Sequence, residues 1–159
     1  MDMKLAFCRL QGETGHTAGR RLLQQLYEEE TGNPMPEIAV SQRGKPYFVD
    51  SPWHFSISHT RHYAFCALSK TPIGIDAEEL DRDIDLHLAD KMLSESEFVQ
   101  YKQAEDPRLA LLKFWVLKEA QAKLTGQGLC GYPSRDTNFS LDDSRLTIQS
   151  NCLLAIMEE

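Results

Sequence analysis

Five short extended segments fill the middle third of the chain and limit what it can fold into. Between Ile38 and Ala77, runs of β-favouring residues alternate with turn sequences. The runs are "IAVS", "KPYFV", "HFSIS", "YAFCALS" and "IGIDAE", and the turns include "RGK", "DSP" and "KTP". This part of the chain is therefore predicted to form sheet.

A strand and a helix are predicted before this block. The strand lies in "MKLAFCRL", and an apolar stripe at helical spacing follows it. The sequence "GNP" is expected to end the helix near residue 32. The stripe consists of Leu22, Leu23, Leu26 and Tyr27.

Two further helices are predicted after the block from their capping residues. Ser94 with Glu97 forms a capping-box pattern that starts a short helix. Asp106–Pro107 provides a cap and a first helical position for a long helix through "RLALLKFWVLKEAQAKL". This helix is expected to end at Gly126 or Gly128, because glycine adopts the left-handed conformation that terminates helices.

The chain length fits a single domain made of two parts. The 159 residues are enough to bury one ordinary core. The plausible boundary lies near residues 70–73, which gives a first half of about 1–71 and a second half of about 72–159. The tail is expected to form two or three strands with a tight turn at Asp142 and Asp143.

Composition and charge exclude several classes of function. The net charge of −7 argues against non-specific binding to nucleic acid or to anionic membranes. No apolar run reaches the roughly 20 residues of a membrane helix, and no signal-peptide pattern is present, so we expect a cytoplasmic protein. The cysteines have no CxxC spacing, and we expect reduced thiols rather than metal ligands at Cys8, Cys66, Cys130 and Cys152.

The segment "GIDAE" is the first candidate for chemistry. Side chains alternate along a strand, so Asp76 and Glu78 share one face while Ile75 and Ala77 share the other. Adjacent carboxylates repel unless a cation lies between them, and Mg²⁺ prefers such hard oxygen ligands. The alternative is a strand that runs into a solvated acidic loop, because the negative run continues beyond Glu78.

The long helix carries the second candidate, Glu119 and Lys123, which are one turn apart. On a helix surface such a pair contributes only about 0.3–0.5 kcal/mol. Here Leu112, Trp115 and Val116 share its face, and a charge pair on the apolar side of a helix is costly without a partner. Glu119 is then a metal ligand or a general base, and Lys123 is a ligand for a phosphate oxygen.

The third candidate is "FSISHT", preceded by "RGKP". Ser58 and His59 are adjacent in an extended segment and face opposite ways, so they do not form a hydrolase pair. His59 at a strand end suits donation to a phosphate, and a structural histidine is the alternative.

Together these motifs resemble the 4'-phosphopantetheinyl transferase superfamily, in its branch with fused halves that activates peptide synthetases. The resemblance runs from about Arg43 to Leu129. It rests on "RGKP", "FSISH", "GIDAE" and "KFWVLKEAQAKLTGQGL" in this order. A GxDxE strand about forty residues before a WxxKExxxK helix is the specific part of the pattern.

The resemblance implies an activity. Members transfer the phosphopantetheine arm of coenzyme A to a serine of an acyl or peptidyl carrier protein and release adenosine 3',5'-bisphosphate, with Mg²⁺ at the pyrophosphate. It implies roles for Asp76, Glu78 and Glu119 as metal ligands, and for Asp76, Glu119 and Lys123 in catalysis. It also implies coenzyme A contacts for Lys45, Pro46, Ser58, His59 and Lys123. Whether His16, Arg20 or Arg21 binds the 3'-phosphate stays open.

The motifs and the resemblance agree on an α+β fold. We expect two similar small halves, a pseudo-dimer in which each half packs a long helix on an antiparallel sheet, with the active site in the cleft between them. One chain holds both sets of motifs, so we expect a monomer. A metal-dependent phosphoesterase or nucleotide hydrolase is the alternative function, followed by a coenzyme A binding module without catalysis.

Overall fold

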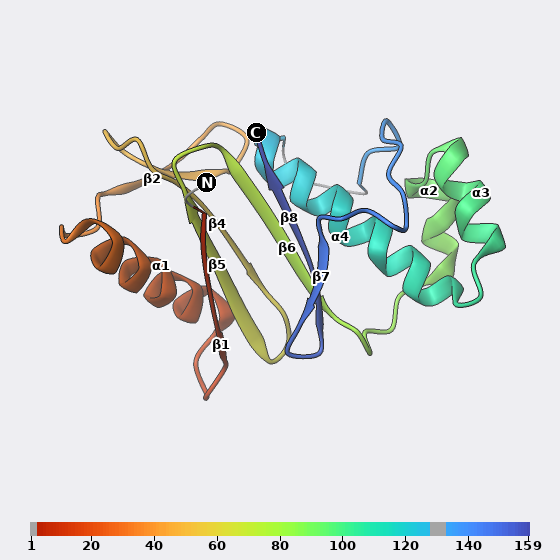
Figure 1. The fold of residues 1–159 in the computed structure, drawn as a ribbon, viewed down its shortest axis with the longest axis horizontal. Coiled ribbons are helices and arrows are strands. Elements are labelled where there is room, and N and C mark those ends of the chain that lie inside the picture. The colour runs from red at the N-terminus through yellow and green to blue at the C-terminus, as the bar shows by residue number, and fades with distance from the viewer. Residues whose placement is uncertain (1–2, 128–132) are drawn as a thin grey trace.

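The chain forms a mixed α/β structure, seen in a computed structural model that describes residues 3–127 and 133–159 (Figure 1). Its helices and 3-10 turn are α1 (Gly15–Thr31), η1 (Leu86–Leu88), α2 (Ala89–Met92), α3 (Glu95–Gln103) and α4 (Pro107–Thr125). Its strands are β1 (Lys4–Arg9), β2 (Ile38–Val40), β3 (Pro46–Phe48), β4 (His54–His59), β5 (Tyr63–Ser69), β6 (Ile73–Glu79), β7 (Leu146–Gln149) and β8 (Cys152–Glu158). Gly128 and Cys130 lie outside the described residues.

Two three-stranded antiparallel sheets form the centre of the molecule. One has the order β1-β5-β4 and the other β6-β8-β7, while β2 and β3 form a separate pair. Helix α1 packs on the first sheet and α4 on the second. The predicted fold class, helices packed on antiparallel sheets, is confirmed, and the internal similarity of the two halves stays a prediction.

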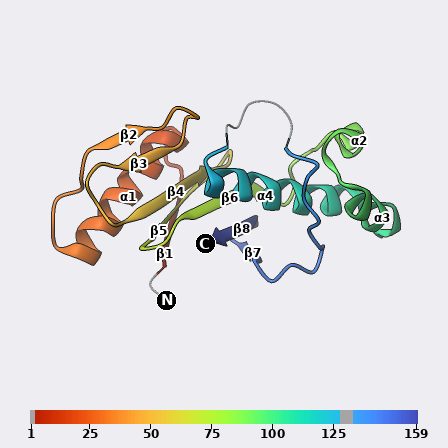
Figure 2. The same cartoon turned by 90° about the horizontal axis from the view of Figure 1, so that it is seen from above.

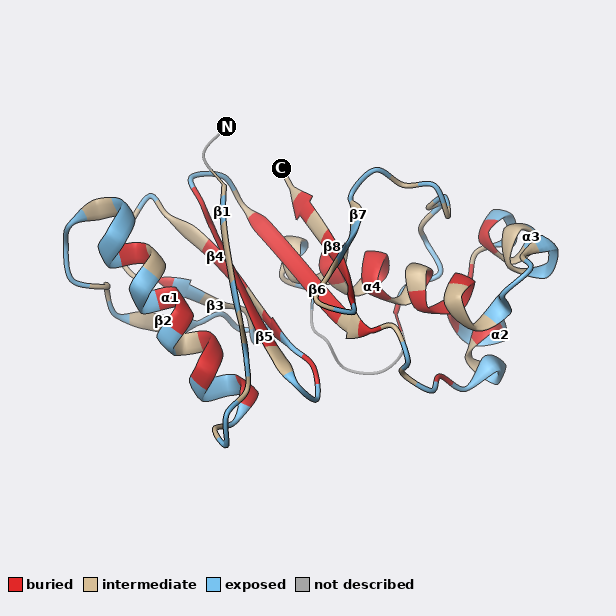
Figure 3. Ribbon diagram, turned by 60° about the horizontal axis from the view of Figure 1, so that its bottom comes forward, coloured by how far each residue is buried: buried red, intermediate tan, exposed pale blue. Residues whose placement is uncertain are grey.

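Successive side chains of a strand point to opposite faces of the sheet, and this alternation divides the core into three clusters. On β5, Ala64, Cys66 and Leu68 pack with α1, while on β8 Leu153, Ala155 and Met157 pack with α4. The alternate residues of both strands join β6 in a third cluster between the sheets. Figure 3 shows this burial along β5 and β6. The third cluster is Phe65, Ala67, Ile73, Ile75, Ala77, Cys152 and Leu154.

Serine side chains join the two sheets where β4 and β6 lie side by side (Figure 2). The Ser56 hydroxyl accepts the backbone N–H of Ile75 at 3.0 Å, and the Ser58 hydroxyl accepts that of Ala77 at 3.0 Å. From the first contact to the second, the residue number rises by two on both β4 and β6, so these two strands run parallel to each other. The connection from β5 to β6, between Ser69 and Ile73, crosses from one sheet to the other, and the division into two halves at residues 70–73 stays a prediction.

The predicted helix ends are confirmed by their caps. Ser94 and Glu97 form both hydrogen bonds of a capping box. The Asp106 carboxylate accepts the Leu109 N–H, and Pro107 is the first residue of α4. Gly126 ends the helix with a φ of 72°, a conformation that glycine adopts without strain.

The tight turn expected at Asp142 and Asp143 is present, because the Asp143 N–H donates to the carbonyl oxygen of Ser140 at 3.1 Å, but the turn of the closing hairpin lies elsewhere. Strands β7 and β8 are joined by Ser150 and Asn151, with φ values of 50° and 60°. Two left-handed residues in succession form the tight turn that matches strand twist. Asp143 instead lies before β7, where its carboxylate binds Arg145 at 2.7 Å. Among the described residues, none of the helices combines the length and apolar character needed to cross a bilayer.

Candidate active site

The candidate site lies where β6 crosses α4, and Gly74 allows the crossing. A Cβ atom at Gly74 would lie 2.2 Å from the carbonyl oxygen of Ala120 and 2.4 Å from the nitrogen of Leu124. Only glycine therefore lets the strand pack this closely on the helix. The residues that follow it on the same face, Asp76 and Glu78, are brought to α4 as a result.

Asp76 is the buried centre of the site, with 7% of its surface exposed. Its Oδ1 accepts the Ser58 hydroxyl at 3.3 Å and lies 3.2 Å from the Lys123 ammonium. Within the described part of the chain, Oδ2 is buried without a hydrogen-bond partner. Burial raises the pKa of Asp76 above its ordinary value, although Lys123 and Ser58 act in the opposite direction.

Lys123 has a different partner from the one its spacing indicates. In the described residues its ion pair is with Asp76 rather than with Glu119. Its ammonium also donates to the carbonyl oxygen of Ile57 at 3.3 Å. Lys123 thus connects α4 to both β4 and β6, which a surface pair on one helix does not do.

Glu78 and Glu119 are the other two carboxylates near this crossing. Burial, followed by the charge of Asp76, raises the pKa of Glu78 to about 7. The same two causes raise the pKa of Glu119. The charge of Asp76 therefore repels both Glu78 and Glu119, as expected for a group that attracts a cation.

The acidic run beyond the strand divides into two kinds of residue. Glu79 is buried and binds Nδ1 of His62 at 2.6 Å, so it fastens the end of β6 to the β4–β5 turn. Asp81, Asp83 and Asp85 are exposed, as the alternative of a solvated acidic loop predicts. That alternative does not describe the buried Asp76.

The three carboxylates are chemically suited to bind a hard cation, but two of them already form ion pairs with basic side chains. Mg²⁺ prefers carboxylate oxygens, and one of the three carboxylates here, Asp76, has a buried oxygen without a hydrogen-bond partner among the described residues. Among the residues described, no group of three or more acidic, histidine or cysteine side chains has the spacing to hold a metal ion as it stands. Asp76 is paired with Lys123 and Glu78 with Arg82, so a metal needs these side chains to move.

A pocket of about 350 Å³ next to the crossing brings together three of the predicted coenzyme A contacts. Lys45, Pro46 and Lys123 line it, together with Ser56 and Ile57. The Lys45 ammonium donates to the carbonyl oxygen of Leu124 at 2.9 Å, so it caps the end of α4. Burial lowers the pKa of Lys45.

His59 and Ser58 are placed differently. His59 is exposed at the end of β4 and lines a second cavity of about 660 Å³ together with Glu78 and Arg82. A Cβ at Gly15 would lie 2.3 Å from the His59 ring, so the ring rests on the first residue of α1. Ser58 lines neither of these two pockets, and its hydroxyl accepts the Ala77 N–H and donates to Asp76.

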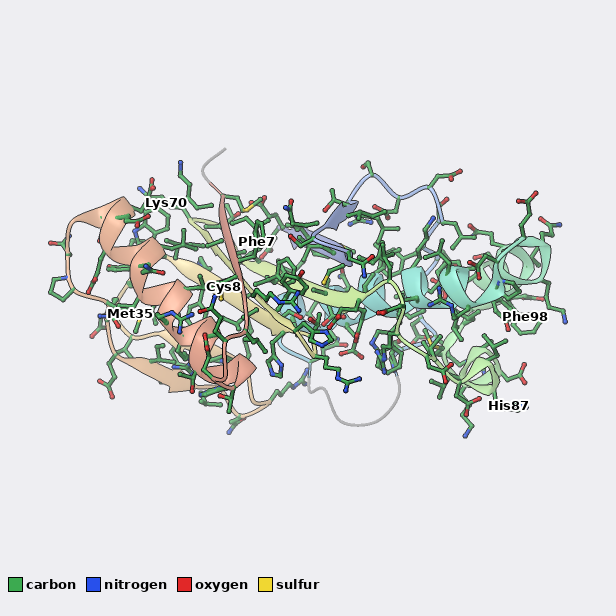
Figure 4. All side chains as sticks on the ribbon, turned by 90° about the horizontal axis from the view of Figure 1, so that it is seen from below. Phe7, Cys8, Met35, Lys70, His87 and Phe98 are labelled. Carbon is green, nitrogen blue, oxygen red and sulfur yellow. The ribbon has the colours of Figure 1, made fainter. Side chains whose placement is uncertain are left out.

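Of the basic residues of α1 left open by the sequence, Arg21 is the one for which the described part of the chain supplies an ion-pair partner. Its guanidinium forms an ion pair with Glu13 at 2.8 Å. The ends of the molecule lie well away from the junction, as Met35 near α1 and His87 and Phe98 near α2 and α3 show (Figure 4).

Sequence reasoning missed a buried ion pair behind the site. Lys118, next to Glu119, binds Glu97 at 2.7 Å, and their side chains are 1% and 0% exposed. The Thr137 hydroxyl and the Phe139 N–H donate to the second Glu97 oxygen at 2.8 and 2.9 Å. A lysine within the apolar run of α4 is the signal that could have revealed this pair.

Comparison with known proteins identifies the family. The family model described as "4'-phosphopantetheinyl transferase superfamily" matches residues 72–155, which is more than half of the chain. The chain therefore belongs to this superfamily, and the resemblance inferred from its motifs is confirmed. Asp76, Glu78, Glu119 and Lys123 lie inside the matched region, whereas the proposed coenzyme A contacts at Lys45, Pro46, Ser58 and His59 lie before it.

Curated relatives bear the same family name. The chain is 31% identical to the 4'-phosphopantetheinyl transferase psf-1 of Bacillus pumilus over 82% of this chain and 58% of that protein. It is 35% identical to the transferase gsp of Aneurinibacillus migulanus over 56% and 38%. It is 32% identical to the transferase HetI of Nostoc sp. over 71% and 52%. The chain spans about half the length of the curated relatives it matches.

Proposed function

We propose that this protein transfers the 4'-phosphopantetheine arm of coenzyme A to a serine of an acyl or peptidyl carrier protein, releasing adenosine 3',5'-bisphosphate. The observation that carries the proposal is the crossing of β6 and α4. There, the buried Asp76 pairs with Lys123, and two further carboxylates of raised pKa lie near it. Membership of the superfamily supports the reaction class.

In this proposal Mg²⁺ is held by Asp76, Glu78 and Glu119. The ion supplies neutralising charge for the pyrophosphate of coenzyme A. The orphaned Oδ2 of Asp76 and the repulsion that its charge exerts on Glu78 and Glu119 support this choice of ligands. Magnesium dependence is tested by comparing transfer with Mg²⁺ present and after its removal by a chelator.

The protein side chains position the reactants and move one proton. The carrier serine oxygen bonds to the phosphorus of the pantetheine phosphate as the bond from that phosphorus to the bridging oxygen breaks. The leaving adenosine 3',5'-bisphosphate keeps the bridging oxygen. Glu119 accepts the serine proton, because its raised pKa makes it a stronger base than an ordinary carboxylate. Lys123 stabilises the negative charge on the transferred phosphate.

Coenzyme A is proposed to lie in the pocket lined by Lys45, Pro46 and Lys123, with His59 towards its phosphates. The stem of Lys45 and the ring of Pro46 form a wall of the pocket, while the Lys45 ammonium stays on the helix end. Because one chain supplies β4, β6 and α4, we propose a monomeric enzyme. The cytoplasmic location stays a prediction.

The deciding experiment incubates a panel of apo carrier proteins with coenzyme A, Mg²⁺ and this protein, and measures the carrier mass. We expect addition of phosphopantetheine to at least one carrier, and loss of that activity in Glu119→Gln. Glu105→Gln, an exposed glutamate just before α4, is the matched control and keeps activity. Cleavage of coenzyme A without a carrier identifies a hydrolase instead. Binding of coenzyme A with neither reaction identifies a binding module.

A further inference from the structure

Arg82 forms an ion pair with Glu78, and the backbone of the turn that carries Arg82 is held in place by α4. Its Nη1 lies 2.5 Å from Glu78 Oε1, and its guanidinium lies 5.1 Å from the centre of the Trp115 ring. Arg108 of α4 donates to the carbonyl oxygens of Leu80 and Arg82 at 2.7 and 3.0 Å. The backbone of this turn is therefore fixed to α4, while the Arg82 side chain is 36% exposed and is held by Glu78 and the Trp115 ring.

Two cationic side chains contact the carboxylates of the site. Nη1 of Arg82 lies 2.5 Å from Oε1 of Glu78, and the Lys123 ammonium lies 3.2 Å from Oδ1 of Asp76. Each of these contacts takes up a carboxylate oxygen that the proposed metal site would use.

We propose that Arg82 is a displaceable counter-ion that must leave Glu78 before a divalent cation can bind there. A carboxylate oxygen that holds a guanidinium at 2.5 Å has no room for a cation on the same side. A metal and the Arg82 guanidinium therefore compete for Glu78. The inference rests on the proposed function only for the metal ligands, and it adds a side chain that regulates their occupancy.

The structure gives the displaced side chain a place to go. The cavity of about 660 Å³ is lined by Arg82 and Glu78 and also by His59 and Arg61. Rotation of Arg82 away from Glu78 and Trp115 moves its guanidinium into this cavity without a change in the backbone. The side chain is about one-third exposed already, at 36%.

The test measures Mn²⁺ binding by the purified protein without coenzyme A or carrier, from the paramagnetic resonance signal of free Mn²⁺. Arg82→Met keeps much of the stem that packs on Trp115 and removes the competing charge. We expect it to bind Mn²⁺ about tenfold more tightly, because a charge-assisted hydrogen bond no longer has to break. Arg61→Met removes a charge from the same cavity and serves as the control, with a change below about threefold.

A second measurement follows the displacement itself through Trp115. Trp53 is replaced by phenylalanine, which leaves Trp115 as the single tryptophan. Mn²⁺ quenches nearby fluorescence by its own paramagnetism, so Mg²⁺ is used for this titration. We expect Mg²⁺ to change the Trp115 emission as the guanidinium leaves the ring, and we expect a smaller change in Arg82→Met, where only the interaction of Trp115 with Glu78 remains to respond. Thermal melts of each variant confirm that the fold is retained.

Equal Mn²⁺ affinity in wild type and Arg82→Met overturns the inference, as does the absence of an emission change in Trp115. An equal gain in Arg61→Met also overturns it, because the effect is then general electrostatics. Absence of binding in wild type and Arg82→Met alike overturns both this inference and the proposed metal site. Carrier modification without an Arg82 effect leaves the proposed function standing alone. An Arg82 effect without carrier modification leaves this inference standing alone.

Discussion

Replacing Lys118 by methionine tests the buried ion pair that holds the segment before β7 to the helices. The change keeps the packing of the stem but leaves Glu97 charged at a position with 0% side-chain exposure. Removing one partner of a buried pair typically costs about 3–5 kcal/mol. Glu97 keeps hydrogen bonds from the Ser94 and Phe139 N–H groups and the Thr137 hydroxyl, so we expect the lower end, about 3 kcal/mol.

Urea unfolding followed by circular dichroism measures this loss of unfolding free energy. The loss is also expected to depend on pH. Burial raises the pKa of Glu97, but hydrogen bonds from Lys118, Ser94 and Phe139 outweigh it, so in wild type the pKa lies below its ordinary value. The pair's contribution is therefore present at neutral pH and lost as the pH falls through the pKa of folded Glu97. In Lys118→Met that pKa rises, so Glu97 takes up a proton and the deficit shrinks between neutral and acidic pH.

Lys113→Met, on the same helix but partly exposed, is the matched control, with a change below about 0.5 kcal/mol. A loss below about 1 kcal/mol in Lys118→Met at neutral pH would refute the reasoning. A deficit that stays constant as the pH falls would also refute it, because the cost then comes from packing rather than from an unpaired charge.

Three further predictions concern the crossing of β6 and α4. Gly74→Ala should destabilise the fold by about 2–4 kcal/mol in urea unfolding, since its Cβ meets the Ala120 carbonyl oxygen, and a loss below about 1 kcal/mol contradicts the close approach. Lys123→Met should slow single-turnover transfer to a carrier by about 10²- to 10³-fold at saturating coenzyme A, and a normal rate returns Lys123 to a structural role. Glu78→Gln should gain stability relative to wild type as the pH rises through about 7, because the raised pKa of Glu78 makes the charged form unfavourable in the fold. Thermal melts of wild type and Glu78→Gln at pH 5 and pH 8 check this prediction. An equal difference in melting temperature at the two pH values contradicts it.

Rules that depend on neighbours in the sequence predicted much of this structure. The capping box at Ser94 and Glu97 and the stop at Gly126 follow from local hydrogen bonding and backbone conformation, so their neighbours along the chain decide them. The shared face of Asp76 and Glu78 follows from the alternation of side chains along a strand. These features needed no knowledge of the tertiary fold.

The partners of the charged side chains depend on the tertiary fold and were not predicted. Lys123 has Glu119 one turn away on its own helix, yet it pairs with Asp76 of a strand that is distant in sequence. Lys45 caps α4, a helix that begins more than sixty residues later. Long side chains reach any group within several ångströms, so only the packing of strands on helices decides which contact forms.

The serine contacts between β4 and β6 make the shape of the site depend on the docking of the two sheets. Ser58 uses one hydroxyl both to hold the Ala77 backbone and to donate to Asp76. Any widening of this boundary withdraws a hydrogen bond from the buried carboxylate before either sheet loses a strand pairing of its own. The hydrogen bonding of Asp76 therefore depends on how closely the two sheets pack. During gradual denaturation we expect coenzyme A binding to be lost before the helical circular dichroism signal.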